Sequence, residues 1–127
     1  MFFYANKGQN RVFQQAVIIG SAGVCGKKEG EGPLAADFDA IFEDTTMGQE
    51  SYELAESAML HDAIIRALSN ANTAPSEVNF VLSGDLLNQC MGSSFALKDL
   101  MMPSIGLYGA CSTMALSLSI GAMLVDG

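Results

Sequence analysis

The sequence predicts an α/β protein with a mostly parallel sheet covered by helices. Short β-branched apolar runs alternate along the chain with stretches that have helical periodicity. Half of the 127 residues are hydrophobic, which is enough for one modest domain with one core. No residue from Met101 to Val125 is charged, as expected for a buried strand followed by a buried helix. Alternating strands and helices favour parallel pairing, because the crossover helices then cover the sheet.

The expected elements follow from this alternation. A glycine-rich, charged loop with one helical turn is expected at 25–46, and a turn at 70–78. Strands are expected at 14–24, 78–85 and 104–110, and helices at 50–68, 94–100 and 112–125.

The longest expected helix, 50–68, is the best defined. Its apolar residues recur at helical spacing, and acidic residues lie near its start, where the helix dipole favours negative charge. The apolar positions are Leu54, Ala58, Ile65 and Leu68, and the acidic ones are Glu53 and Glu56.

Charge and cysteine content exclude several classes of protein. The net charge is -8, so a nucleic-acid binder, which needs a basic surface, is not expected. Ten acidic residues lie between Glu29 and Asp62, which places most of the solvated surface in the first half. The three cysteines form no C-x-x-C pair, so neither a zinc site nor a disulfide framework is expected.

Targeting and membrane-spanning segments are not expected either. The apolar run after Lys7 and Arg11 is short and broken by glycine, unlike a secretory signal. The uncharged stretch from Met101 to Val125 is interrupted by Pro103, glycines and serines, which argues against a transmembrane helix.

The stretch "LYGACSTMAL" (107–116) holds a candidate functional cysteine. Cys111 lies between an expected strand and an expected helix, the layout of a nucleophile elbow. A thiol at a helix N-terminus is favoured as the thiolate, and Ser112 and Thr113 can cap that helix. The pattern alone equally fits a small buried thiol at a tight turn.

The stretch "SGDLLNQ" (83–89) holds a second group of candidates. Asp85 follows an expected strand, and ligands of open parallel sheets bind beyond the carboxyl ends of strands. Asp85, Asn88 and Gln89 are therefore expected to face the same crevice as Cys111. The alternative is that Asp85 only caps the next helix.

Several motifs in combination resemble the stage V sporulation AD family, a branch of the thiolase-like superfamily. The segments that carry the resemblance are "EGEGPL" (29–34), "ESYELAESAMLHDAI" (50–64), "SGDLLNQ" (83–89) and "LYGACST…GAMLVDG" (107–127).

The resemblance implies a domain organisation. Thiolase-like proteins have two similar layered α/β halves, and this chain matches only the first. We therefore expect an N-terminal segment at 1–13 and a thiolase-like N-terminal half-domain at 14–127, truncated after the helix that follows Cys111. Condensing enzymes of the superfamily use this cysteine as acyl acceptor, with histidines or a His/Asn pair from the second half. His61, the single histidine, matches no such motif and is expected to be a half-exposed helical residue.

The resemblance also implies a function. The family is associated with binding dipicolinic acid and with its uptake into the developing spore, and the binding positions carry over onto Asp85 and Cys111. A dianionic ligand needs donors, which the helix start at Ser112 and Thr113 could supply. Asp85 tolerates such a ligand only with a bridging calcium ion or a proton, and Lys98 could assist.

Two classes of function therefore stay open at this point. The first is a non-catalytic dipicolinic acid binder, intracellular and peripheral at the inner membrane of the developing spore. Its expected partners are other stage V sporulation membrane proteins, with a homodimer also compatible and no nucleic acid. The alternative is a thiolase-type acyltransferase that uses Cys111; an enzyme would need the His-bearing half to make and use the thiolate.

Overall fold

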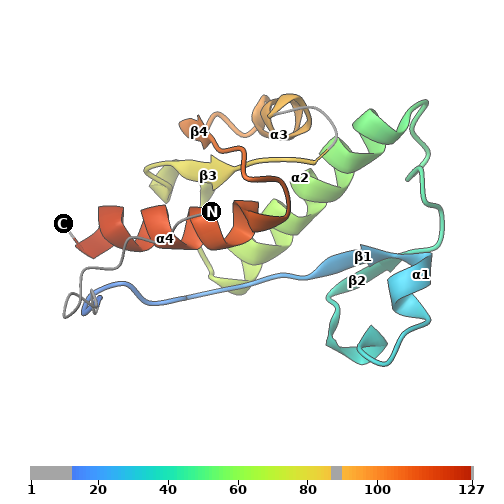
Figure 1. Cartoon of the computed structure of the whole chain (residues 1–127), viewed down its shortest axis with the longest axis horizontal. Coiled ribbons are helices and arrows are strands. Elements are labelled where there is room, and N and C mark those ends of the chain that lie inside the picture. Colours follow the sequence, from blue (N-terminus) through green and yellow to red (C-terminus); the bar gives the residue numbers. More distant parts are fainter. Residues whose placement is uncertain (1–12, 87–89, 127) are drawn as a thin grey trace.

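The computed structural model describes residues 13–86 and 90–126, and it is an α/β structure of short parallel strands and helices (Figure 1). In chain order the elements are β1 (Val24–Gly26), α1 (Lys27–Gly30), η1 (Ala35–Asp37), β2 (Ala40–Phe42), α2 (Tyr52–Asn70), η2 (Pro75–Glu77), β3 (Val81–Ser83), α3 (Met91–Leu97), β4 (Ser104–Gly106), η3 (Ala110–Ser112) and α4 (Thr113–Asp126).

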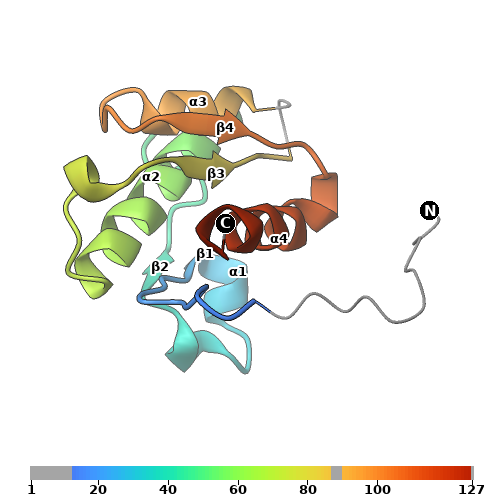
Figure 2. The same cartoon turned by 90° about the vertical axis from the view of Figure 1, so that its left-hand side faces the viewer.

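The strands form two separate parallel pairs. In one pair Val24 of β1 faces Ala40 of β2, and in the other Val81 of β3 faces Ser104 of β4. Figures 1 and 2 show β3, β4 and α3 at one end of the molecule and β1, β2 and α1 at the other. The predicted α/β class and parallel pairing are confirmed, whereas the prediction of one continuous sheet is wrong for the described residues.

The sheet divides because the strand expected at 14–24 is regular only from Val24 onward. Upstream of it, the Gly23 carbonyl still accepts the Asp39 N–H at 2.8 Å, and side chains supply further hydrogen bonds to the backbone. The Asn70 amide donates to the Ser21 carbonyl at 2.8 Å, and the Gly23 N–H donates to an Asp39 carboxylate oxygen at 2.8 Å. These bonds attach the segment to the end of α2 and to the residue before β2.

The loop expected at 25–46 contains more regular structure than predicted. The expected helical turn is α1, but the chain then forms β2, which the sequence analysis missed. The run Ala40–Phe42 is too short to show an alternating pattern, and acidic residues flank it. Its partner β1 therefore defines β2 as a strand, through tertiary pairing rather than local propensity.

The long helix α2 begins at Tyr52 because Ser51 caps it, with the Ser51 hydroxyl accepting the Leu54 N–H at 3.3 Å. Its buried position is Ala55, at 4% exposure, and it packs against α3. Of the four apolar positions that predicted this helix, Leu54 and Ile65 are 43% and 40% exposed, whereas Ala58 and Leu68 are partly buried. The α2 residues that line cavities are Glu56, Met59, Leu60, Ala63, Ile64, Ala67 and Leu68 on two sides of the helix, and Leu54, Ser57, Ala58 and His61 on a third.

The expected helix at 94–100 begins earlier, as α3 at Met91, and it supplies much of the small core. Four of its residues are buried: Gly92, Ser93, Ala96 and Leu97.

The last helix, α4, is far more exposed than the sequence suggested. It packs against β3, yet none of its residues is buried, and Met114 is 76% exposed. All residues of β4 are exposed as well. The prediction of a buried strand and a buried helix is thus wrong for the described residues, although α4 contacts β3 and η3, and Gln14 and Gln15 donate to the Asp126 carboxylate at its end. Within the described ranges, no helix combines the length and hydropathy that crossing a membrane requires.

Candidate functional site at the ends of β3 and β4

The strands β3 and β4 end side by side, as the sequence analysis predicted. Ser83 pairs with Gly106, and the Leu107 N–H extends the ladder by donating to the Ser83 carbonyl at 2.7 Å. Because the strands are parallel, the loop that holds Asp85 and the turn that holds Cys111 leave from the same edge.

Gly84 allows these two connections to approach one another. A Cβ at this position would overlap the Leu107 carbonyl oxygen and would lie 2.8 Å from the Thr113 Cγ2 atom. Only glycine fits between the end of β3 and the start of α4, so the first residue after β3 shapes the site by lacking a side chain.

Asp85 is buried, with 5% of its surface exposed, and its carboxylate caps α3. One oxygen accepts the Cys90 N–H at 2.9 Å. The other accepts the Ser93 N–H at 2.9 Å and the Ser93 hydroxyl at 3.2 Å. These bonds satisfy N–H groups that α3 cannot bond internally. Capping by Asp85, one of the two alternatives, is therefore present, and a ligand role for Asp85 stays a prediction.

Glu56, on α2, lies beside Asp85 and was not predicted as a site residue. One of its carboxylate oxygens accepts the Leu86 N–H at 3.2 Å. The other is buried and has no hydrogen-bond partner among the described residues. A Cβ built on Gly92 would lie 3.2 Å from Glu56 Oε2 and 3.4 Å from Asp85 Oδ2, so both carboxylates reach the same point on α3.

A cavity of about 250 Å³ opens between α2, β1 and the end of β3, and both carboxylates line it. The remaining lining is apolar, apart from Gly84: Val24, Met59, Leu60 and Ala63. The sequence did carry a signal for this arrangement. Glu56 lies three and four residues before Met59 and Leu60 and shares their helix face, although its position near the helix start indicated a dipole role.

Cys90 is a second residue of the site that the sequence analysis missed. Its thiol lies 3.3 Å from the Leu107 carbonyl oxygen, which links the start of α3 to the end of β4. Its backbone has a positive φ of 76°, unusual for a residue other than glycine. Nothing in the flanking sequence predicts this conformation, in which the Cys90 N–H donates to the Asp85 carboxylate at 2.9 Å.

Cys111 lies in η3, between β4 and α4, and its side chain is exposed. Ala110 before it has a positive φ of 46°, which sharpens the turn. Cys111 is not among the residues that line the Asp85 cavity. The order of strand, cysteine and helix is present, and the nucleophile elbow itself stays a prediction.

The predicted donors around Cys111 are engaged within the turn. The Ser112 hydroxyl donates to the Gly109 carbonyl at 2.6 Å, and the Ser112 N–H donates to the same oxygen at 2.9 Å. The Thr113 hydroxyl accepts the Gly109 N–H at 3.2 Å, a bond that does not use its hydrogen. The candidates Asn88 and Gln89 lie outside the described residues.

The basic side chains considered from the sequence lie elsewhere. His61 and Lys98 line a separate groove between α2 and α3, with a volume of about 320 Å³. The Lys98 ammonium lies 6.0 Å from the centre of the Phe95 ring. No cation from the described residues therefore lines the Asp85 cavity, which would repel a bare dianion.

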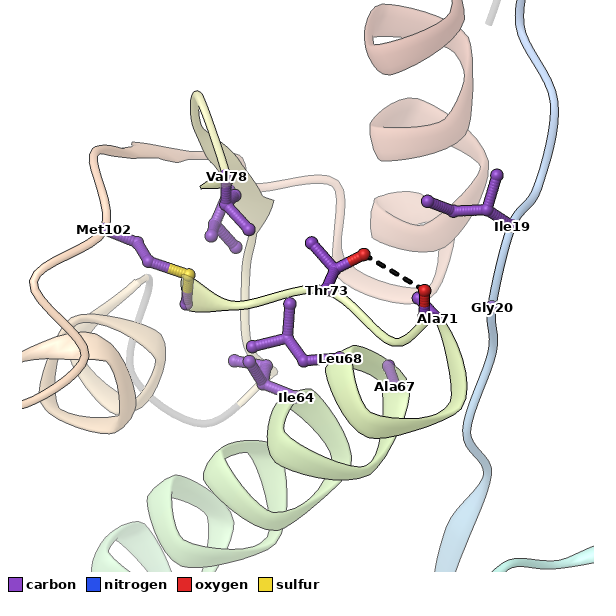
Figure 3. A pocket seen from close by; sticks show the side chains of 10 residues that line it. Ile19, Gly20, Ile64, Ala67, Leu68, Ala71, Thr73, Val78 and Met102 are labelled. Carbon is purple, nitrogen blue, oxygen red and sulfur yellow. Dashed lines mark hydrogen bonds between the residues drawn. The ribbon is translucent and has the colours of Figure 1, made fainter. Parts of the chain in front are cut away.

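A third cavity, of about 280 Å³, lies between the segment before β1, the end of α2 and the start of β3 (Figure 3). Ile19 and Gly20 form one side, and α2, Val78 and Met102 form the others. Its polar side chain, Thr73, has a hydroxyl that donates to the Ala71 carbonyl at 3.2 Å. The cavity is thus almost wholly apolar and offers little to a charged ligand.

Fold and site together define an α/β protein in which two neighbouring parallel strands end at one edge. The loop after one strand holds Asp85, and the turn after the other holds Cys111. The chain belongs to the stage V sporulation protein AD (SpoVAD) family, whose family model matches residues 7–127. It is similar to stage V sporulation protein AD of Bacillus subtilis (strain 168), with 35% identity over 120 residues. That alignment covers 94% of this chain and 36% of the relative, so the chain spans about a third of the relative's length. The family resemblance inferred from the sequence motifs is confirmed.

Proposed function

We propose that this protein, in its complete form, binds dipicolinic acid and takes part in its uptake into the developing spore. We further propose that it has a thiolase-like fold that it does not use for condensation. Membership of a sporulation family supports the proposal. The structural observation that carries it is the pairing of Ser83 with Gly106, since this pairing brings the Asp85 loop and the Cys111 turn to one edge.

The proposed ligand site comprises the residues of these two connections. They are Asp85, Asn88, Gln89, Cys111, Ser112 and Thr113. The unused hydroxyl hydrogen of Thr113 is a donor for a ligand carboxylate. Cys111 is exposed on the same edge and shapes the site, because a thiol is a weak donor.

The charge of the site bears on the form in which the ligand binds. Dipicolinic acid is a dianion at neutral pH, and Asp85 and Glu56 both line the cavity at this edge. Like charges at short range disfavour one another, so a bare dianion is a poor occupant. We therefore propose that the ligand binds with calcium or in a protonated form.

For the complete protein we propose an intracellular location, peripheral at the inner membrane of the developing spore. Other stage V sporulation membrane proteins are the proposed partners, and a homodimer is compatible with the arrangement.

Titration of the complete protein with dipicolinic acid, with and without calcium, tests the proposal. We expect Asp85→Asn to weaken binding roughly tenfold or more, since a hydrogen bond to a charged group contributes about 1.5–3 kcal/mol. We expect a smaller loss for Cys111→Ala. Asp99→Asn is the matched control, because the Asp99 side chain is 78% exposed. Tighter binding by Asp85→Asn in both conditions would remove Asp85 from the ligand site.

The second candidate function is acyl transfer by Cys111, and the exposed thiol in the turn before α4 is the observation that favours it. An acyl acceptor would take up a labelled acyl group from an acyl-CoA. We expect no adduct by mass spectrometry in the complete protein. An adduct that disappears in Cys111→Ser would instead establish the enzyme.

A further inference from the structure

We propose that Glu56 is a positioning residue of the ligand site, which fixes the start of the loop after Asp85. This inference rests on the proposed function for its consequence in binding, but its structural part stands on contacts alone. No motif considered from the sequence assigned Glu56 a role beyond the helix dipole.

The helix α2 holds both ends of the connection between β3 and α3. At the first end, the Glu56 carboxylate accepts the Leu86 N–H at 3.2 Å. At the second end, the neighbouring Ser57 hydroxyl lies 3.0 Å from the Gly92 carbonyl oxygen and 3.0 Å from the Glu53 carbonyl oxygen, and its one hydrogen is shared between these two acceptors. Consecutive residues of α2 thus contact Leu86 and Gly92, which are described residues on either side of 87–89.

The same connection is also held from within by Asp85, which accepts the Cys90 N–H and the Ser93 N–H. Glu56 therefore binds Leu86, at the end of β3, while Asp85 binds Cys90 and Ser93, at the start of α3. Gly92 makes this possible, because a larger residue there would press on both carboxylates.

The second carboxylate oxygen of Glu56 shows that a single acceptor oxygen is enough at this position. Glu56 Oε2 is buried without a hydrogen-bond partner in the described part of the chain, which is unfavourable for a carboxylate. The Leu86 bond needs only one acceptor oxygen, which a glutamine also supplies. In Glu56→Gln the second position becomes an NH₂ donor beside Asp85 Oδ2, and one of two neighbouring negative charges is removed.

This gives a sharp distinction between variants. If Glu56 positions the loop through its acceptor, Glu56→Gln keeps the Leu86 bond and Glu56→Ala loses it. We expect the Leu86 amide to exchange with deuterium roughly tenfold faster in Glu56→Ala and at the wild-type rate in Glu56→Gln. The matched control is Glu50→Ala, which removes an exposed acid just before α2.

The test uses the complete protein and combines hydrogen exchange with dipicolinic acid titration. Wild-type Leu86 exchange in Glu56→Gln, with faster exchange and weaker binding in Glu56→Ala, would support the proposal. Unchanged Leu86 exchange in Glu56→Ala, or equally faster exchange in both variants, would overturn it. If Glu56→Ala does not fold, Glu56→Gln alone decides, because faster Leu86 exchange in that variant contradicts the acceptor role.

The two proposals fail in different ways. A wild-type protein that does not bind dipicolinic acid overturns the proposed function, while the exchange rates still test the role of Glu56. Binding that is present in the wild type and unaffected in Glu56→Ala, despite faster Leu86 exchange, would instead remove Glu56 from the ligand site.

Discussion

The carboxylate of Asp85 accepts both the backbone N–H and the hydroxyl of Ser93, at 2.9 and 3.2 Å. A buried carboxylate that is bonded in this way stabilises the start of α3 irrespective of any ligand. Effects of Asp85 substitutions on binding must therefore be separated from effects on folding.

Replacing Asp85 by asparagine should lower the free energy of unfolding by about 1–3 kcal/mol. An amide has one acceptor oxygen, so its NH₂ group would face either the Cys90 N–H or the Ser93 N–H, both donors. Urea denaturation followed by circular dichroism measures the change. Asp99→Asn should unfold like the wild type, since the Asp99 side chain is 78% exposed. An Asp85→Asn variant as stable as Asp99→Asn would mean that the capping bonds contribute nothing.

Gly84→Ala should destabilise the protein by about 3 kcal/mol, because the new Cβ overlaps backbone. The atoms in its way are the Leu107 carbonyl oxygen and Thr113 Cγ2. The control is Gly26→Ala, where an added Cβ meets nothing within 4 Å. Thermal unfolding compares the two variants. If Gly84→Ala had the same melting temperature as Gly26→Ala, β3 and α4 would have to move apart without cost.

The α/β class and the parallel neighbours β3 and β4 could be predicted from the sequence, because β-branched runs and alternation are local signals. The short strand β2 could not, since Ala40–Phe42 becomes a strand only by pairing with β1. For α2, helical spacing predicted the helix but not the burial of each position, since Leu54 and Ile65 satisfy that spacing and are 43% and 40% exposed.

The candidate site was predicted in part. Asp85 and Cys111 lie after neighbouring strands as expected, but the sequence could not show that Asp85 is buried and Cys111 exposed. Glu56 and Cys90 act through contacts distant in sequence, with Leu86 and Leu107 respectively. Such contacts depend on the packing of α2 and α3, which no local pattern encodes.

The three cysteines should differ in reactivity toward iodoacetamide. Cys111 is exposed and should react first, whereas Cys25 is buried at 7% exposure. Burial, together with the nearby Glu29 carboxylate, raises the pKa of the Cys25 thiol and so reduces its thiolate fraction. We expect Cys25 to react at about a tenth of the rate of Cys111 or more slowly still, as measured by peptide mass spectrometry. Unfolding in urea should remove the difference, and similar rates in the folded protein would contradict the burial of Cys25.

The exposed apolar surface of α4 should cause this 127-residue chain to self-associate when it is expressed alone. Met114 and Val125 are 76% and 60% exposed. Light scattering should show oligomers that Met114→Lys reduces. Ser119→Lys, which adds the same charge to α4 without removing an apolar side chain, should reduce them less. A monodisperse wild-type monomer would contradict this expectation.

The carboxylate of Asp39 should make the stability depend on pH in the acidic range. The Gly23 N–H donates to it at 2.8 Å and the Asn70 amide at 3.2 Å, and these bonds lower its pKa from the ordinary value. A pKa that is lower in the folded state stabilises the protein at pH values above the unfolded pKa of about 3.9, and this stability is lost as the pH falls through the folded pKa.

The difference in free energy of unfolding between the wild type and Asp39→Asn should therefore be constant near neutral pH and shrink below about pH 4. Urea denaturation of dilute protein from pH 7 to pH 3 measures it, with Asp37→Asn in the exposed η1 turn as the control. An advantage that persists unchanged at pH 3 would mean that these bonds do not depend on the charge of Asp39.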